Sequence, residues 1–131
     1  MRILPIFFVL VIVLGGCTRT QPVYNVTDRA FPEAAKNLSM TEIGNAIIAS
    51  PRSRGWALQK VSPGVIEGEI KLRKHYAKIT INYNKTNYSI KYLSSRNLMA
   101  TGSEIHRNYN KWIRNLEDDI WQSVSKAAAK S

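Results

Sequence analysis

A group of polar residues in the C-terminal third of the chain has the types that nucleophilic catalysis uses. In hydrolases that use a serine nucleophile, a histidine activates the serine, and a third polar group orients the histidine. Ser95 and His106 would be nucleophile and base, with neighbours Ser94, Asn97, Tyr109 and Asn110. The sequence has no Gly-x-Ser-x-Gly turn, and loops use the same residue types to satisfy buried backbone groups. We therefore predict no catalytic residues and no enzyme, and keep a hydrolase using Ser95 and His106 as an alternative.

Metal ligands are few and dispersed. The chain has two histidines, His75 and His106, which belong to different predicted elements, and one cysteine, Cys17. A structural zinc site takes four ligands, usually cysteine and histidine side chains at short spacings. The sequence therefore predicts neither a metal site nor a cofactor.

Paired carboxylates could act as acid and base if their environments moved their pKa values apart. Glu117, Asp118 and Asp119 form such a run, and Glu67 and Glu69 form another pair. The run flanks an apolar helical stripe in a basic chain, and the pair lies on the polar side of a strand. Both patterns are typical of surface carboxylates in ion pairs with nearby Lys and Arg.

The elements that position these residues follow from hydrophobic periodicity. Apolar residues alternate with polar ones in four segments, around 56–59, 66–73, 76–83 and 88–92, which predicts strands with one buried face. The connections between them are short, with turns at Pro63-Gly64, around 73–75 and at 84–87, so we expect an antiparallel meander. Residues 94–102 are predicted to be a polar loop.

Two helices flank the strands. Ser39 or Thr41 would cap a helix that runs to about Ser50, where Pro51 ends it. Ser103 would cap a longer helix whose stripe is Ile105, Tyr109, Trp112, Ile113, Leu116, Ile120 and Val124. The predicted fold is an α+β two-layer sandwich: an N-terminal helix, a four-stranded antiparallel meander sheet, and a long C-terminal helix packed across it.

The N-terminus has the pattern of a secretory signal. Arg2 precedes an apolar run from Ile3 to Leu14, too short to cross a bilayer and followed by small residues. Leu14-Gly15-Gly16-Cys17 resembles the bacterial lipobox, which implies cleavage between Gly16 and Cys17 and acylation of Cys17. Thr18 stands where an aspartate would imply retention in the inner membrane. The resemblance therefore implies a Gram-negative lipoprotein, anchored in the cell outer membrane and facing the periplasm.

The predicted organisation has three parts. Residues 1–16 are the signal peptide, 17–38 a lipid-anchored tether with two prolines and one helical turn near 32–36, and 39–131 a single domain. The full chain carries a formal net charge of +10, and about +9 without the signal peptide. Such a surface attracts polyanions, and in the envelope these are lipids, glycans or acidic proteins rather than nucleic acid.

Several short motifs resemble a group of small bacterial lipoproteins that are uncharacterised. The matching residues include Gly55-Trp56, Arg73-Lys74-His75, Tyr88-Ser89-Ile90-Lys91-Tyr92, Ser95-Arg96-Asn97-Leu98 and Ile105-His106-x-x-Tyr109-Asn110-x-Trp112. The likeness covers about two-thirds of the chain after Gly16. It implies the envelope address and the fold, and no activity.

Together these patterns favour a lipid-anchored, non-enzymatic module that binds an envelope protein or an anionic lipid or glycan. The predicted contact residues are Lys71, Arg73, Lys78, Lys91 and Arg96. The alternative is an inhibitor or immunity-type lipoprotein that blocks a wall-degrading enzyme through a protruding loop at 94–102.

Overall fold

The structure is a computed structural model that describes residues 2–3, 19–51 and 53–131. Five strands form an antiparallel sheet in the order β2-β6-β5-β4-β3. Their bounds are Val26–Ala30 for β2, Trp56–Ser62 for β3, Val65–Leu72 for β4, His75–Tyr83 for β5 and Asn87–Arg96 for β6. A separate two-stranded sheet pairs β1, Thr20–Pro22, with β7, Glu104–His106. The helices are η1, Glu33–Asn37, α1, Met40–Ala49, and α2, Arg107–Ala129.

The predicted meander is confirmed for β3 to β6, which pair with their neighbours in chain order. Its strands alternate as expected, since residues such as Ile66, Ile79, Ile81 and Ile90 are fully buried. Two of the three turns contain a residue with φ > 0: Gly64 (φ 76°) connects β3 to β4, and Arg73 (φ 56°) connects β4 to β5. The four-strand prediction is nevertheless one strand short, because β2 joins the sheet beside β6.

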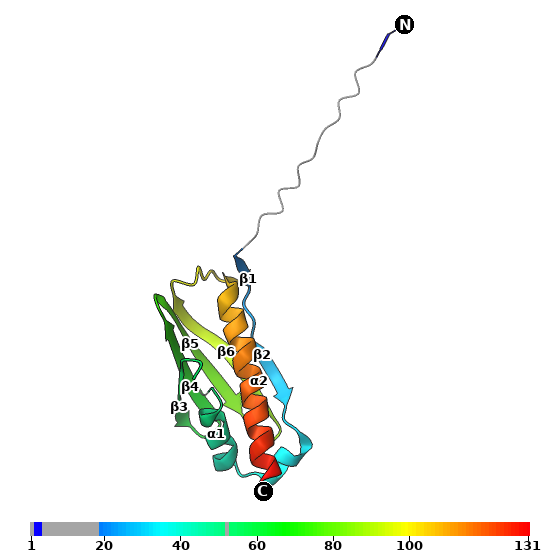
Figure 1. The fold of residues 1–131 in the computed structure, drawn as a ribbon, viewed down its shortest axis with the longest axis vertical. Helices are drawn as coiled ribbons and strands as arrows, with labels where there is room; N and C mark the ends of the chain where they lie inside the picture. Colours follow the sequence, from blue (N-terminus) through cyan, green and yellow to red (C-terminus); the bar gives the residue numbers. More distant parts are fainter. Residues whose placement is uncertain (1, 4–18, 52) are drawn as a thin grey trace.

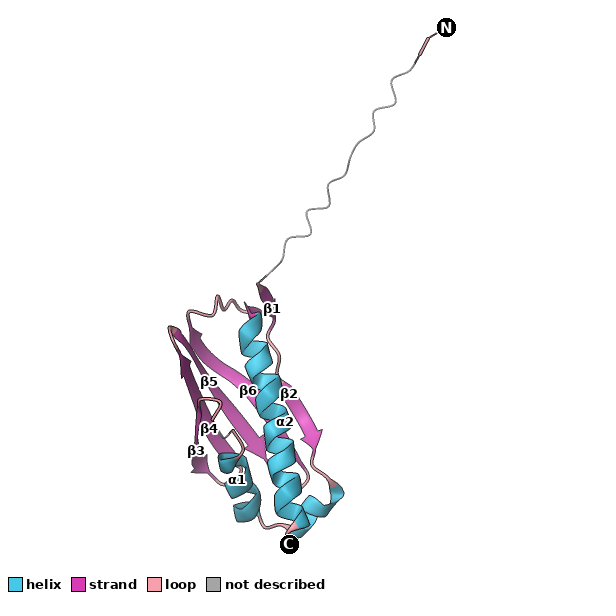
Figure 2. Cartoon of the chain, in the orientation of Figure 1, coloured by secondary structure: helices cyan, strands magenta, loops and turns pink. Residues whose placement is uncertain are grey.

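Both helices lie against one face of the sheet, which gives the predicted two layers. Figures 1 and 2 show α2 running along the sheet with α1 beside its C-terminal half. The helices bury an apolar stripe against the strands, consisting of Ile43, Ala46 and Ile47 in α1 and Tyr109, Ile113, Leu116, Ile120 and Val124 in α2. The core is therefore the space between this stripe and the inner face of the sheet.

The first helix begins as its sequence predicts. The Ser39 hydroxyl accepts a hydrogen bond from the Glu42 amide, and the Glu42 carboxylate accepts one from the Ser39 amide, both at 3.1 Å. This reciprocal pair is the capping box, which satisfies two amides that a helix start leaves open. Pro51 follows the last turn.

The predicted tether is wrong over residues 20–38, which form β1, β2 and η1 and belong to the domain. Val26, Phe31, Ala35 and Leu38 are buried in the core. β2 pairs with β6, more than fifty residues later in the chain, and a bulge interrupts its register at Asp28 (φ 48°). The bulge erases the alternation that would mark this strand in the sequence. The predicted helical turn near 32–36 is confirmed as η1.

The predicted start of the long helix is also wrong. Ser103 precedes a strand, and Ile105 is buried in β7 rather than in the helix. The helix begins at Arg107, with His106 as its N-cap. The polar loop is likewise shorter than predicted, because β6 continues through a bulge to Arg96.

Candidate functional site

One face of the five-stranded sheet carries no helix of the described chain. We call it the open face, and define it by Glu67, Glu69 and Lys71 of β4, Tyr76, Lys78 and Thr80 of β5, and Lys91 and Arg96 of β6. The structure brings four of the five predicted contact residues together on this face. The fifth, Arg73, lies in the adjoining turn between β4 and β5.

Strand register places these side chains in rows. Lys71, Tyr76 and Arg96 are opposite one another on three neighbouring strands. The guanidinium carbon of Arg96 lies 4.4 Å from the Tyr76 ring centroid, within the range of a cation–π contact. The row therefore places one cation on each side of an aromatic ring.

The charge of the open face is only partly balanced. Lys78 Nζ lies 3.5 Å from Glu67, the one ion pair on this face among the described residues. Lys71, Lys91 and Arg96 take part in no described ion pair, and all three are exposed. Cations without an ion-pair partner remain available to an anionic partner.

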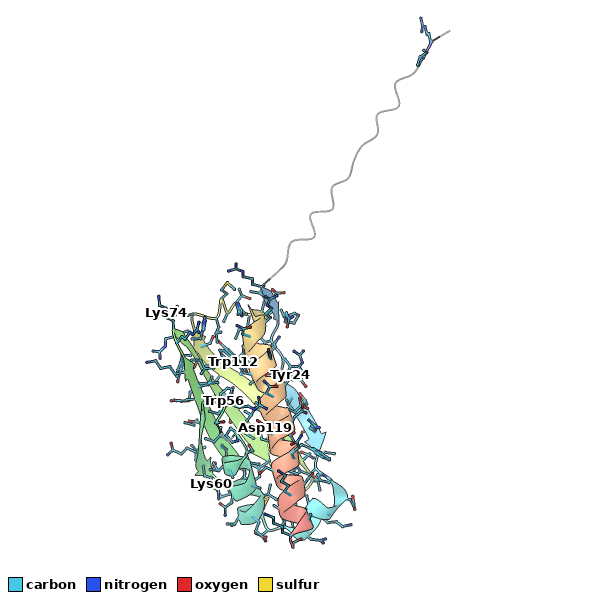
Figure 3. The ribbon with its side chains drawn as sticks, in the orientation of Figure 1. Tyr24, Trp56, Lys60, Lys74, Trp112 and Asp119 are labelled. Atoms are coloured by element: carbon cyan, nitrogen blue, oxygen red, sulfur yellow. The ribbon has the colours of Figure 1, made fainter. Side chains whose placement is uncertain are left out.

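A second group of cations lies at one end of the molecule, where β1, the turn between β4 and β5, the loop before β7 and the start of α2 meet (Figure 1). We call it the basic end: Arg19, Arg73, Lys74 and Arg107, all exposed. The Arg107 amide donates to the Arg19 carbonyl at 2.9 Å. The Asn97 side chain donates to the Lys74 carbonyl at 2.7 Å. Figure 3 labels Lys74 at this end.

The two histidines also lie at the basic end, with ring centroids 6.4 Å apart. His75 Nδ1 donates to the Asn97 carbonyl at 2.7 Å, while His106 Nδ1 accepts from the Asn108 amide at 3.1 Å as the cap of α2. Partial burial and the neighbouring Arg107 lower the pKa of His106. Among the described residues no three His, Cys, Asp or Glu side chains come together as a metal site would need.

The residues considered for nucleophilic catalysis have separate partners. The Ser95 hydroxyl lies 2.7 Å from the Tyr92 hydroxyl, and the Asn110 side chain donates to the Pro22 carbonyl at 2.9 Å and accepts from the Tyr24 amide at 2.9 Å. No hydrogen bond joins Ser95 to His106 in the part of the chain that the structure describes. This geometry supplies no nucleophile–base pair.

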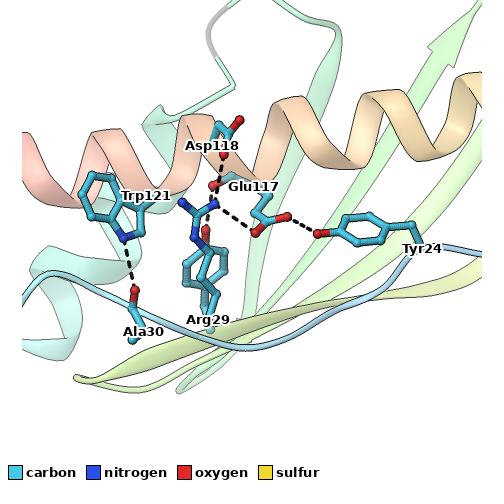
Figure 4. Close-up of polar contacts among 7 residues, drawn as sticks. Tyr24, Arg29, Ala30, Glu117, Asp118 and Trp121 are labelled. Atoms are coloured by element: carbon cyan, nitrogen blue, oxygen red, sulfur yellow. Dashed lines mark hydrogen bonds and ion pairs between the residues drawn. The ribbon is translucent and has the colours of Figure 1, made fainter.

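The acidic run of α2 is divided among three partners. Glu117 accepts from Tyr24 Oη at 2.5 Å and from Arg29 Nη1 at 2.9 Å, while Asp118 accepts from the same Arg29 nitrogen at 3.0 Å (Figure 4). Asp119 pairs with Arg54 at 2.6 Å. The hydrogen bond to Glu117 raises the pKa of Tyr24.

These carboxylates hold the N-terminal segment to the helix. Tyr88 Oη also reaches α2, donating to the Glu117 carbonyl at 2.6 Å. We call Tyr24, Arg29, Tyr88, Glu117 and Asp118 the Glu117 cluster. Beside it, the Trp121 indole donates to the Ala30 carbonyl at 3.1 Å. The expected ion pairs with basic residues are confirmed for this run. The expected solvated helix face is wrong for Glu117 and Asp119, whose side chains are only 14% and 18% exposed, and the sequence indicated neither Tyr24 nor Arg29 as a partner.

Three of the described concavities adjoin α2, and one of them, of about 410 Å³, lies between Tyr24 and the first turns of the helix at Asn110 and Arg114. A groove of about 540 Å³ between α1 and α2 is lined by Ala46, Ala49, Ser123, Lys126 and Ala127 among others. A smaller one of about 190 Å³ lies between Trp56 of β3 and Trp112 of α2, with Arg54 and Asn115 at its rim. The smallest is below the usual size of a ligand pocket, and the walls of the largest combine alanines with polar and charged side chains rather than the large apolar and aromatic ones typical of a ligand pocket.

The lipidation site and the cleavage site, Gly16 and Cys17, lie outside the described residues. No described helix has the length and apolar composition needed to cross a membrane. Comparison of the chain with protein-family models, curated proteins and solved structures found no match.

Proposed function

We propose that this chain is a lipid-anchored binding module of the bacterial envelope, attached through Cys17 to the periplasmic face of the outer membrane. The open face would bind a partner that carries negative charge. The observation that carries the proposal is the row of exposed cations around Tyr76, on a sheet face that no described helix covers.

The open face has the composition that recognition of an acidic surface requires. Arginine and tyrosine are enriched in protein interfaces because they combine large contact area with directed polar groups. Lys71 and Arg96 flank such a tyrosine, and neither has a described ion-pair partner to give up on binding. Charged side chains on an exposed surface contribute little to folding, so these positions are free to serve binding.

The test is crosslinking in intact cells with charge-reversal variants. A photoreactive residue at Thr80, in the middle of the open face, should capture a distinct envelope component. Lys71→Glu with Arg96→Glu should abolish that capture, since each reversal replaces an attraction by a repulsion. Lys85→Glu with Lys130→Glu is the matched control, because it changes the net charge equally on exposed positions outside the open face.

Equal capture by both double variants would contradict the proposal. Acylation is measured separately, by the mass of the N-terminal peptide of the chain and of Cys17→Ala. A chain without acyl groups would contradict the proposed lipid anchor. The proposed contact on the open face would still be tested by the crosslinking result.

A further inference from the structure

We infer that the basic end is a docking surface for an anionic phospholipid bilayer, and that it holds the long axis of the domain upright on the membrane. The inference rests on the proposed acylation of Cys17. It assigns a second surface, which adjoins the open face at the turn between β4 and β5, and gives that surface a lipid partner.

The first argument is the reach of the anchor. The first strand begins at Thr20, three residues after Cys17, and β1 lies at the basic end (Figure 1). Three residues of extended chain span at most roughly 10 Å. An acylated Cys17 therefore keeps this end of the domain close to the lipid headgroups, within about one Debye length at physiological salt.

The second argument is the short connection between anchor and fold. β1 is bound to β7, and the segment after it is bound to α2 by Asn110, which contacts Pro22 and Tyr24, and by Glu117. The N-terminal segment is thus part of the domain from Thr20 onward. If the domain prefers one orientation at the membrane, the preference must come from the surface that surrounds its attachment point at Thr20.

The third argument is charge. Arg19, Arg73, Lys74 and Arg107 have no described ion-pair partner, and Glu104 is the single acid on the elements that meet here in the described chain. Glu104 already accepts a hydrogen bond from Thr20 Oγ1 at 2.9 Å.

The fourth argument is an apolar side chain among the cations. Met99, in the loop before β7, has 49% of its surface exposed although it sits beside the buried Leu98. An exposed apolar residue on an end of the molecule that also carries Lys and Arg is the composition of surfaces that lie in the headgroup region of a membrane. Basic residues close to an anionic bilayer each strengthen binding by about fivefold.

The test uses the native acylated chain, reconstituted in vesicles of phosphatidylethanolamine alone or mixed with phosphatidylglycerol. Acylation occupies Cys17, so a new cysteine is the only free thiol. Met99→Cys places an environment-sensitive fluorophore at the basic end. Lys85→Cys places the same label at the far end of β5, as the matched control.

We expect the label at position 99 to be shielded from an aqueous quencher in the anionic vesicles, and the label at 85 to stay accessible. Added salt should remove the shielding. Lys74→Glu with Arg107→Glu should lower the equilibrium constant for docking by at least about 25-fold, from two residues at about fivefold each.

Equal quenching of both labels in both vesicles would overturn the docking surface while leaving the anchor intact. Failure of the chain to float with the neutral vesicles would instead show that the anchor itself is missing. The two failures are therefore read from different measurements, quenching in one case and flotation in the other.

Discussion

Two polar clusters border the core, and they use their side chains in opposite ways. In the Glu117 cluster, side chains from three distant segments bond to one another or to the backbone of α2. At the basic end lies the cluster of His75, Ser95, Asn97, His106 and Tyr109, which we call the His106 cluster. Its hydrogen bonds go mostly to backbone groups, and Ser95 bonds to Tyr92 of its own strand. Its Tyr109 hydroxyl is buried without a described partner.

The difference shows that residue type is a poor guide to what a polar group does. The His106 cluster has the serine, histidine and amide that suggest catalysis, yet each of these groups completes a turn, a cap or a strand contact. The Glu117 cluster has ordinary surface residue types, yet it closes the domain by joining β2 and its preceding segment to α2. The group to which a polar side chain bonds, rather than its residue type, determines its role.

Alkaline pH should produce the largest effect, and it should act on both clusters. Burial raises the pKa of Tyr88 and of Tyr109. In the unfolded chain both ionise near pH 10, while in the folded chain both stay protonated, so rising pH favours unfolding. From about pH 9 to about pH 11 the free energy of unfolding should fall by roughly 1.4 kcal/mol per tyrosine. Urea titrations across this range measure it, and an unchanged midpoint would contradict it.

Glu117→Ala should have the next largest effect, because it breaks the Glu117 cluster at its centre. The substitution leaves Arg29 with only the exposed Asp118 and leaves the Tyr24 hydroxyl without its acceptor. We expect a loss of about 2 kcal/mol in the free energy of unfolding. Asp118→Ala, which removes an exposed contact to the same arginine, is the matched control and should cost less than about 0.5 kcal/mol. Equal losses in the two variants would be inconsistent with a closing role for Glu117.

The two buried tyrosines should respond differently to loss of the hydroxyl. Tyr88→Phe removes a 2.6 Å hydrogen bond to the Glu117 carbonyl and should cost about 1 kcal/mol. Tyr109→Phe removes a buried hydroxyl that has no described partner, and should be neutral or stabilising. Chemical denaturation of both variants makes the comparison. A loss in Tyr109→Phe as large as that in Tyr88→Phe would reveal a bound water or another partner at Tyr109.

Acid pH should produce the smallest effect, confined to the His106 cluster. The pKa of His106 is lowered in the folded chain, so its contribution to stability is complete above the unfolded value near 6.5 and is lost as pH falls below it. Protonation also removes the Nδ1 lone pair that caps α2. His106→Asn keeps a capping side chain without the titration, and should show a flatter stability profile between about pH 5 and about pH 7. A profile identical to that of the parent chain would exclude His106 as the source.

Much of the fold was predictable because it depends on local pattern. Buried residues alternate with more exposed ones along β4 and β5, and Ser39, followed three residues later by Glu42, has the sequence pattern of a capping box. By contrast, β2 is short, bulged at Asp28 and paired with a distant strand, so no local signal distinguishes it from a tether. The misplaced start of α2 has a similar cause, since β7 exists only through its pairing with β1.

The residues of the candidate site also differ in whether a local sequence pattern could predict their position. Lys71, Lys78 and Lys91 could be assigned to one face because strand alternation and short turns fix their sides. Arg96 was expected in the polar loop, and it reaches this face because β6 continues through a bulge. Arg19, Lys74 and Arg107 could not be grouped, because the contact between Arg19 and Arg107 depends on the pairing of β1 with β7.

The incorporation of residues 20–38 into the domain gives the molecule a mechanical property. A pull on the N-terminus, resisted by a partner on the open face, would act along the strands. The hydrogen bonds of β1 with β7 and of β2 with β6 run across that direction, so the force would shear many of them at once. Shear distributes tension over a whole ladder, whereas peeling concentrates it on one bond at a time. The segment predicted to be a tether would therefore transmit tension from the N-terminus, where we propose the lipid anchor, to the sheet.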